Sequence, residues 1–356
     1  MLFNYRYINH SIERFQTYLD HLVKKVWCRN TGKYSLKLLH PKLREIIEDI
    51  ANDASIEKDW LDGPIKNIDA LFQKKLTASQ RAQVRKWYDH NNDIESLCAG
   101  DSKKQPGTYN EIETMDADLA EQLKTFCTNL FEKVIKLKAV RDQIGSMDDH
   151  YLEFVKENDE GKCPYCGYGD LKGQYHTPRE AYDHYLPKGT YPFNSVNFKN
   201  LAPMCHECNS SYKLQKDPTW NTDPLHKKGP GSRRKAFYSY ATVPSGISVS
   251  LNLNVGDVDQ LTPADIDLHI EAPGRDEELE TWKEVFGIEE RFKAKCCGKN
   301  EGKYWLMQAI DECQNAGKTP KQLLDKIKKN ARNSPWAECN FLKKPFLQAC
   351  QKAGLV

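Results

Sequence analysis

The chain has 356 residues, 39% of them hydrophobic and 29% charged, which is enough for two or three domains with buried cores. It contains no run of 18 or more apolar residues, and its first residues lack the apolar segment of a signal peptide, so the sequence argues against a membrane or exported protein. We therefore expect a cytoplasmic protein without a membrane partner, whose twelve cysteines are mostly reduced.

The net charge of +2 conceals an uneven distribution along the chain. Residues 161–240 contain 12 Lys and Arg against 6 Asp and Glu, a local net charge of +6, so the remainder stands at −4. A basic segment of this kind indicates a phosphate-binding surface. A merely solvated surface is the alternative, since the excess is modest.

Residues 1–160 are predicted to be helical. Apolar residues recur at helical spacing near 12–26, 43–50, 65–72, 84–88 and 116–143, with the last helix the longest. Ser11 is the expected N-cap of the first helix, Pro41 precedes the second, and Thr77 with Gln80 forms a capping box for the fourth. The polar segment 99–107 is predicted to be an exposed loop. The region is either a plain helical scaffold or a docking surface for a partner or DNA, and we favour a partner.

Two Cys-x-x-Cys pairs, Cys163/Cys166 and Cys205/Cys208, are separated by 38 residues. Paired thiolates at this spacing can reach one tetrahedral zinc ion at about 2.3 Å without backbone strain. Four thiolates leave no open coordination position, so we predict a structural Zn²⁺ rather than a catalytic one. A disulfide or coincidence is the alternative. The other eight cysteines show no second metal spacing.

The residues between and after these pairs have catalytic chemistry. Asp183 supplies a hard oxygen for Mg²⁺ or Mn²⁺, and the adjacent His184 can take a proton from water near neutral pH. Asn209 directly follows the last zinc cysteine and offers a second, neutral oxygen. Such a loosely held cation leaves positions for water and a phosphate, which suits metal-assisted hydrolysis of a phosphodiester.

The pattern Cys-x-x-Cys, Asp-His-x-x-Pro-Lys and Asn-Leu-x-x-x-Cys-x-x-Cys-Asn-x-x-x-Lys resembles the HNH, or ββα-metal, endonucleases. The zinc-bound subgroup, which includes phage Holliday-junction resolvases, is the most similar. The resemblance covers about 55 of the 356 residues. It implies a ββα core over residues 161–228, with a strand ending near residues 183–184, a long loop through residues 189–193, a short strand near residue 200 and a helix over 206–215.

Carried over to this chain, the resemblance implies that Asp183 binds the catalytic cation and that His184 is the general base. Asn200 corresponds to the middle residue, which steadies the turn carrying the base, and Asn209 to the second metal ligand, which is His in many members. The chain therefore reads His-Asn-Asn, which leaves the identity and affinity of the catalytic metal open. Lys213 lies four residues after Asn209 and either contacts a phosphate or belongs to a solvated helix face.

The segment 229–235 is predicted to be a flexible basic link, in which Arg233, Arg234 and Lys235 contact a phosphate backbone unless it is a plain linker. Alternating apolar residues over 247–255 and 266–270 predict a β-hairpin, and residues 275–353 are predicted to be helical. Thr319 and Pro320 open one of these helices as N-cap and first residue. There is no Gly-rich nucleotide-binding loop, so ATP hydrolysis by this chain is not expected.

The sequence thus predicts a mainly α protein with a small zinc-bound ββα core: a helical region at 1–160, the nuclease core at 161–228, and a hairpin with helices at 229–356. The expected function is metal-dependent hydrolysis of DNA. The layout is similar to the nuclease component of Septu-type or retron-associated antiphage systems, which implies an ABC- or SMC-like ATPase partner. The alternatives are a zinc-organised nucleic-acid-binding or adaptor module without catalysis, and a restriction- or resolvase-type HNH enzyme.

Overall fold

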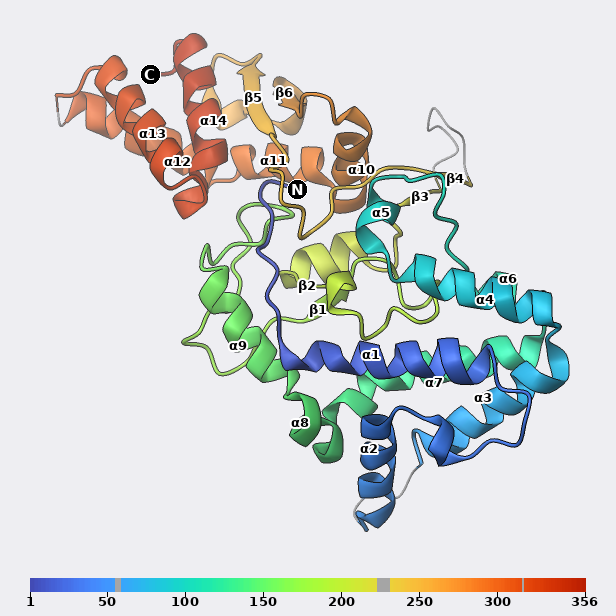
Figure 1. The fold of residues 1–356 in the computed structure, drawn as a ribbon. Coiled ribbons are helices and arrows are strands. Elements are labelled where there is room, and N and C mark those ends of the chain that lie inside the picture. The colour runs from blue at the N-terminus through green and yellow to red at the C-terminus, as the bar shows by residue number, and fades with distance from the viewer. Residues whose placement is uncertain (55–58, 223–230, 316) are drawn as a thin grey trace.

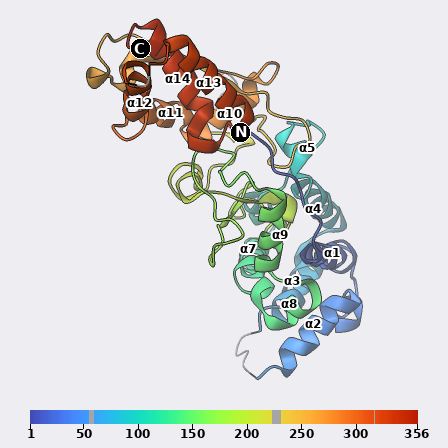
Figure 2. The same ribbon diagram turned by 90° about the vertical axis from the view of Figure 1, so that its left-hand side faces the viewer.

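The computed structural model describes residues 1–54, 59–222, 231–315 and 317–356. Within them the chain is mainly helical, with three two-stranded antiparallel sheets. Figures 1 and 2 show the N-terminal helices at one end of an elongated molecule and helices α11–α14 at the other, with strands β1 and β2 between them. None of the helices in the described ranges is long and apolar enough to cross a membrane.

The region before residue 160 is helical, as predicted. Its helices are α1 Arg14–His21, continued by a π-helical segment Leu22–Trp27, then α2 Pro41–Asn52, α3 Asp62–Lys75, α4 Ala78–Asn91, α5 Ile94–Cys98, α6 Tyr109–Glu113, α7 Ala117–Glu132, α8 Lys138–Ile144 and α9 Met147–Glu157. The capping box of Thr77 and Gln80 is confirmed. The N-cap at the start of the chain is His10, not Ser11: the His10 ring accepts from Ile12 N, and Glu13 completes the box.

The single long helix predicted over 116–143 is wrong. The chain leaves helical conformation at Lys133 and again at Leu137, where ψ is 145°, and a short 3-10 turn, Val134–Lys136, joins α7 to α8. Val134 and Ile135 are both buried at this break. Consecutive residues on a straight helix point about 100° apart, so the break allows both side chains to enter the core. The sequence also gave no separate prediction of α9, which begins with a Ser146 capping box.

Aromatic packing joins the N-terminal helices into one core. Trp27 is fully buried, stacks on Phe72 of α3 at 5.8 Å between ring centroids and meets Phe126 of α7 edge-on at 5.4 Å. Its indole nitrogen donates to the carbonyl oxygen of Ile65 at 3.2 Å, so the polar end of the ring is also satisfied. These helices therefore share one core, and Phe131 of α7 contacts His184 of residues 161–222, which we call the central module.

The central module contains the predicted strands and helix. Strand β1, Tyr182–His184, pairs antiparallel with β2, Leu201–Pro203, with His184 opposite Leu201. Asn200 lies directly before β2, at the end of a 3-10 turn. The following helix begins at residue 206 and its π-helical part, Cys208–Lys213 (η6), ends two residues earlier than predicted, where Leu214 adopts a positive φ of 51°.

The C-terminal region contains the predicted hairpin and helices. Strands β3, Trp220–Asn221, and β4, Ser232–Arg233, form one small sheet, and β5, Ser248–Leu253, pairs with β6, Ile266–Glu271, in another. The helices are α10 Asp276–Phe286, α11 Ile288–Cys297, α12 Gly302–Gln314, α13 Pro320–Asn333 and α14 Asn340–Lys352. Thr319 caps α13 and Pro320 is its first residue, as predicted. Gly229 and Pro230 of the predicted link, and the predicted boundary at 228/229, lie outside the described residues.

Both ends of the chain contact the central module. The backbone N–H of Leu2 donates to Pro164 O at 2.8 Å, and that of Tyr5 donates to Ser239 O at 2.9 Å. From the C-terminal side, the indole of Trp282 donates to Tyr165 O at 2.8 Å. The module is therefore fixed by the helical regions on either side.

Candidate metal centre and active site

The four predicted zinc cysteines lie together in the structure. The Sγ atoms of Cys163, Cys166, Cys205 and Cys208 are all within 4.8 Å of one another, all four residues are buried, and Cys166 and Cys205 are 3.9 Å apart at sulfur. Bonds of about 2.3 Å to a tetrahedral zinc give sulfur–sulfur edges of about 3.8 Å. The cluster therefore fits a zinc ion with four thiolate ligands, which is the arrangement of a structural site.

The first cysteine pair lies on a tight turn that requires a glycine. Gly167 has a φ of +79°, and a Cβ at this position would approach Leu2 and Phe341 to within 3 Å. The turn is closed by Gly167 N donating to Cys163 O at 2.7 Å. It directs the backbone N–H of Gly169 at the Cys166 sulfur, 3.3 Å away, which helps to stabilise a thiolate there.

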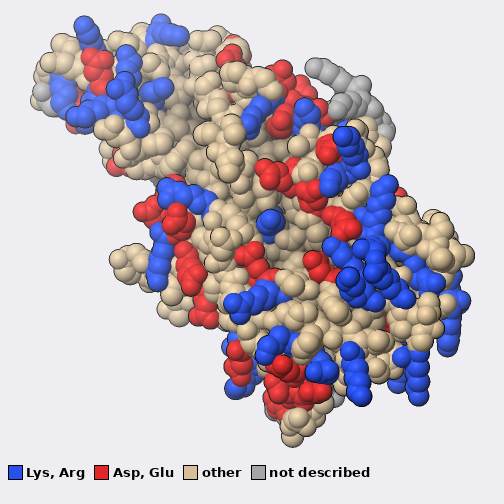
Figure 3. Space-filling view, viewed as in Figure 1, with Lys and Arg blue, Asp and Glu red and all other residues tan. Residues whose placement is uncertain are grey.

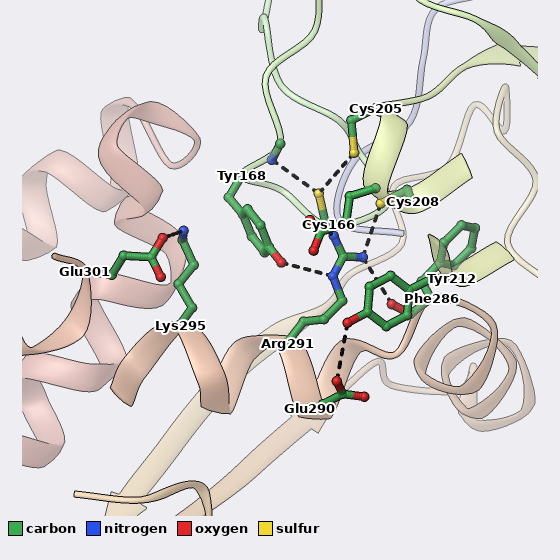
Figure 4. Close-up of polar contacts among 12 residues, drawn as sticks. Cys166, Tyr168, Cys205, Cys208, Tyr212, Phe286, Glu290, Arg291, Lys295 and Glu301 are labelled. Carbon is green, nitrogen blue, oxygen red and sulfur yellow. Dashed lines mark hydrogen bonds and ion pairs between the residues drawn. The ribbon is translucent and has the colours of Figure 1, made fainter. Parts of the chain in front are cut away.

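An arginine from the C-terminal region contacts the cluster, as Figure 4 shows. Arg291 of α11 donates from Nη1 to the Cys208 sulfur at 3.2 Å and pairs through Nη2 with Glu207 at 2.8 Å. Its guanidinium lies 4.4 Å from the ring centroid of Tyr212. Burial is the largest single effect and opposes the charge of Arg291, but Cys208, Tyr168 and Cys166 together outweigh it, so the pKa of the guanidinium is raised.

The sequence analysis missed Arg291. It lies 83 residues after Cys208, on a helix whose apolar pattern is ordinary, and no local motif marks it. Its contacts with thiolate and carboxylate make it an outer partner of the metal centre. The same contacts connect α11 to Glu207 and Cys208, at the start of η6.

Three predicted catalytic residues share one cavity. Asp183, His184 and Asn209 line a cavity of about 120 Å³. Strand β1 supplies the first two, and Asn209 comes from η6, one residue after a zinc cysteine. The remaining lining residues are Tyr182, Pro187, Lys188, Gly189, Leu214 and Gln215. The structure therefore brings a carboxylate, an imidazole and an amide together at the side of the zinc module.

The ring of His184 is held in one tautomer. Its Nε2 lies 2.8 Å from the carbonyl oxygen of Ser195. A carbonyl can only accept, so Nε2 carries the proton and Nδ1 keeps its lone pair. The ring also meets Phe131 of α7 edge-on at 4.5 Å. Burial lowers the pKa of His184 to about 3, so the imidazole is neutral at physiological pH.

Asn200 makes the contacts expected of a residue that steadies the turn after His184. Its Oδ1 accepts from Leu186 N at 2.8 Å and its Nδ2 donates to Leu186 O at 3.0 Å. Its own carbonyl accepts from Tyr185 N at 2.9 Å. Because Asn200 is fully buried, these bonds replace every contact with water and fix the backbone of the two residues that follow the base.

Lys213 is not available for a phosphate. It is fully buried, with Nζ 2.9 Å from Asp183 Oδ2 and 3.0 Å from His184 O. The predicted phosphate contact and the solvated alternative are both wrong, because the side chain turns inward to the carboxylate. Burial raises the pKa of Asp183 above its usual range, and the ammonium of Lys213 opposes that shift.

The predicted substrate-binding residues after 231 occupy three different environments. Arg234 is 2% exposed, pairs with Glu284 and donates from Nε to Pro218 O at 3.3 Å, so a phosphate contact would displace these partners. Arg233 is half-buried in β4 and donates from Nη2 to Leu97 O at 3.2 Å. The side chain of Lys235 is exposed, while its backbone N–H donates to Glu277.

Part of the basic charge of residues 161–240 is ion-paired within the fold. Its ion-paired members are Lys162, Lys172, Arg179, Lys188, Lys213 and Arg234. Figure 3 shows several acidic side chains across the middle of the molecule and a cluster of basic side chains to the right of them. The sequence count therefore overstates the charge that this module offers to a phosphate backbone.

Comparison with known proteins gives one short similarity. The chain is similar to the Septu protein PtuB of Bacillus thuringiensis, with 34% identity over 68 residues. The match covers 18% of this chain and 25% of that protein, so it spans about a quarter of the relative's length. No model of a known protein family matches the chain, and no solved structure is significantly similar to it.

Proposed function

We propose that this chain is a metal-dependent HNH endonuclease that hydrolyses DNA phosphodiester bonds with a water activated by His184. The observation that carries the proposal is the shared cavity of Asp183, His184 and Asn209 beside the cysteine cluster. The order of β1, β2 and the helix around η6 agrees with the ββα core of that family. The zinc-bound module supplies rigidity, and the chemistry belongs to the cavity.

The residues of the cavity fit a catalytic Mg²⁺ or Mn²⁺. Asp183 offers a carboxylate and Asn209 an amide oxygen, which are the hard ligands that these ions prefer. Both oxygens of the Asp183 carboxylate also contact the ammonium of Lys213, at 2.9 and 3.2 Å, so a bound cation would share the carboxylate with that ammonium. A bound divalent cation supplies charge stabilisation to the phosphoryl oxygens during hydrolysis.

His184 acts on the attacking water. With Nε2 donating to Ser195 O, the ring accepts a proton at Nδ1, and the Ser195 carbonyl stabilises the imidazolium that forms. A base with a pKa of about 3 is weak in the free protein. A phosphate anion bound beside the ring favours the protonated form, so substrate binding raises this pKa toward the working range. Asn200 keeps the turn after the base in position throughout.

The similarity to PtuB supports a role in antiphage defence. In that setting the nuclease acts with an ABC- or SMC-like ATPase, and the helical region 1–160 is the surface on which the ATPase docks. A retron complex is the second setting that the resemblance allows. Because the matched stretch is short, the assignment to antiphage defence also depends on the proposed zinc site and on the helical regions on both sides of it.

A zinc-organised adaptor without catalysis is the second candidate. The buried pair of Asp183 and Lys213 favours it, because such a pair can be purely structural. A restriction- or resolvase-type HNH enzyme is a further alternative, in which the same cavity cleaves DNA in another biological setting.

Cleavage of supercoiled plasmid with Mg²⁺ or Mn²⁺ tests the proposal. Wild type and His184→Ala are compared with His176→Ala, whose exposed imidazole lies outside the cavity. We expect nicked or linear product from wild type and His176→Ala only. Equal cleavage by His184→Ala rejects the mechanism, and intact plasmid with the ATPase present favours the adaptor.

A further inference from the structure

A second, larger cavity adjoins the proposed active site. Its volume is about 980 Å³, and it shares Gly189, Leu214 and Gln215 with the catalytic cavity. Its walls come from the start of α6, the loop around residue 190, residues 214–222 and β4. Sites for small ligands are about 300–1,000 Å³, so this cavity can hold at least one nucleotide unit. The mechanism derived above does not use it.

The charged side chains that line this cavity give it a net charge of +1, from four basic and three acidic groups. Glu284 pairs with Arg234, whereas Glu111 and Asp217 accept hydrogen bonds from neutral groups and keep their charge. Lys124, Lys216 and Arg233 also line it, and no ion pair of theirs is found among the described residues.

Arg233 has donors that lack an acceptor. Its Nη2 donates to Leu97 O, but Nε and Nη1 are buried and make no hydrogen bond to any described part of the chain. A guanidinium N–H group without an acceptor can donate a charge-assisted hydrogen bond to a phosphate oxygen. Buried donors without acceptors are unfavourable, so an anionic oxygen entering the cavity would be stabilised there.

An aromatic ring lies in the same cavity. Trp220 of β3 lines it with 39% of its surface exposed, and it pairs in register with Arg233 of β4. Leu214, between the two cavities, is 56% exposed. An exposed indole beside an uncompensated guanidinium is the combination that binds a base by stacking and its phosphate by charge.

We propose that this cavity binds an unpaired nucleotide of the substrate strand next to the scissile phosphate, with its base stacked on Trp220 and its phosphate on Arg233. The inference rests on the proposed nuclease function and specifies its substrate class. In a duplex, both faces of a base are covered by its neighbours, so stacking on Trp220 requires an unpaired base. The substrate is therefore single-stranded, or locally unpaired beside the cleavage position.

A measurement of oligonucleotide binding tests this inference independently of catalysis. A fluorescein-labelled single-stranded oligonucleotide and the duplex of the same sequence are titrated with His184→Ala protein, and anisotropy is measured. We expect the single strand to bind more tightly than the duplex. Adding Trp220→Ala should weaken single-strand affinity about five- to hundredfold, whereas Trp220→Phe retains most of it.

Two further variants complete the design. Arg233→Gln should reduce the slope of log affinity against log salt by about one. Tyr175→Ala removes a 92% exposed ring outside the cavity and should change nothing. Thermal melting of Trp220→Phe and Trp220→Ala identifies any loss of binding that follows from unfolding.

The outcomes distinguish the two proposals. Three results would overturn the subsite. They are equal single-strand affinity of the folded Trp220→Ala and parent proteins, tighter binding of the duplex than of the single strand, and no binding of either oligonucleotide. If His184→Ala cleaves plasmid as fast as wild type while binding depends on Trp220, the catalytic assignment fails and the subsite stands.

Discussion

The ammonium of Lys213 lies 2.9 Å from the carboxylate of Asp183, and both side chains are buried. The lysine comes from η6 and the aspartate from β1, so the pair joins the helix that begins beside the cysteine cluster to the strand that carries His184. It also balances a carboxylate that burial alone would favour in its neutral form. Lys213 therefore favours the charged form of the proposed metal ligand, although burial still raises the pKa of Asp183 above its usual range.

Lys213→Met should destabilise the protein strongly. It leaves the Asp183 carboxylate buried without its partner, which costs about 3–5 kcal/mol for a buried ion pair broken on one side. Urea unfolding measures the change, and Lys216→Met, an exposed lysine three residues later, is the matched control. The double variant with Asp183→Asn should be more stable than Lys213→Met alone. Equal stability of the two lysine variants would show that the pair does not operate in solution.

Arg291→Met should weaken zinc binding without removing a ligand. Outer partners of metal ligands typically contribute about 10- to 100-fold in affinity, and Arg291 stabilises the Cys208 thiolate directly. Competition with a chromophoric chelator measures the change. Arg332→Met, on the exposed surface of α13, is the control and should leave zinc affinity unchanged. Zinc release at the same chelator concentration from all three proteins would contradict the role of Arg291.

Zinc removal should disrupt the central module and with it the catalytic cavity. Native mass spectrometry is expected to find one zinc per chain, lost in Cys163→Ser and retained in Cys313→Ser, whose half-buried thiol lies outside the cluster. Because Asn209 follows Cys208 directly, loss of the metal displaces a cavity residue as well. A chain that keeps full thermal stability in strong chelator would exclude a structural zinc.

The metal centre and most of the cavity could be predicted because their residues lie in short motifs of fixed order. Each motif is only a few residues long: the two Cys-x-x-Cys pairs, Asp183 with His184, and Asn209 beside Cys208. The residues within each motif therefore lie close together because of local structure. The clamp of Asn200 on the turn after His184 was also predictable, since Asn200 directly precedes the strand that pairs with the strand of His184. No equivalent signal marks Arg291, because its partner is 83 residues away.

The burial of Lys213 could not be predicted because the helix is not regular there. Leu214 N donates to Asn209 O at 3.0 Å, five residues earlier, which is a π-helical bond. The wider turn changes which residues share a face, so the α-helical spacing from Asn209 to Lys213 was misleading. The break between α7 and α8 is a similar case, since tertiary burial of Val134 and Ile135 prevails over helical periodicity.

Asn200→Ala should cost about 1–3 kcal/mol for each backbone group of Leu186 that it leaves without a partner. The turn after His184 then loosens, so plasmid cleavage should fall more than binding of an oligonucleotide. Asn252→Ala, at an exposed asparagine of β5, provides the comparison. Unchanged cleavage by Asn200→Ala would mean that the clamp does not position the base.

Stability should fall as the pH drops from about 6.5 toward 3, and His150 is one cause. Burial lowers its pKa from the usual value near 6.5 to about 3, with His10 and Arg179 adding to the shift, and its Nδ1 bonds the hydroxyl of Tyr182. In that window the unfolded chain binds a proton at residue 150 and the folded chain does not. Unfolding is therefore favoured by up to about 1.4 kcal/mol per pH unit for this one group.

His150→Gln keeps a polar partner for Tyr182 and removes the titration, so its stability should depend less steeply on pH between 3 and 6.5 and match the wild-type slope above about pH 7. Urea unfolding across this range measures the slope. The remaining slope includes His184, whose pKa is also about 3. His176→Gln, an exposed histidine, should retain the full wild-type dependence. Parallel curves for His150→Gln and wild type would mean that His150 is protonated in the folded protein.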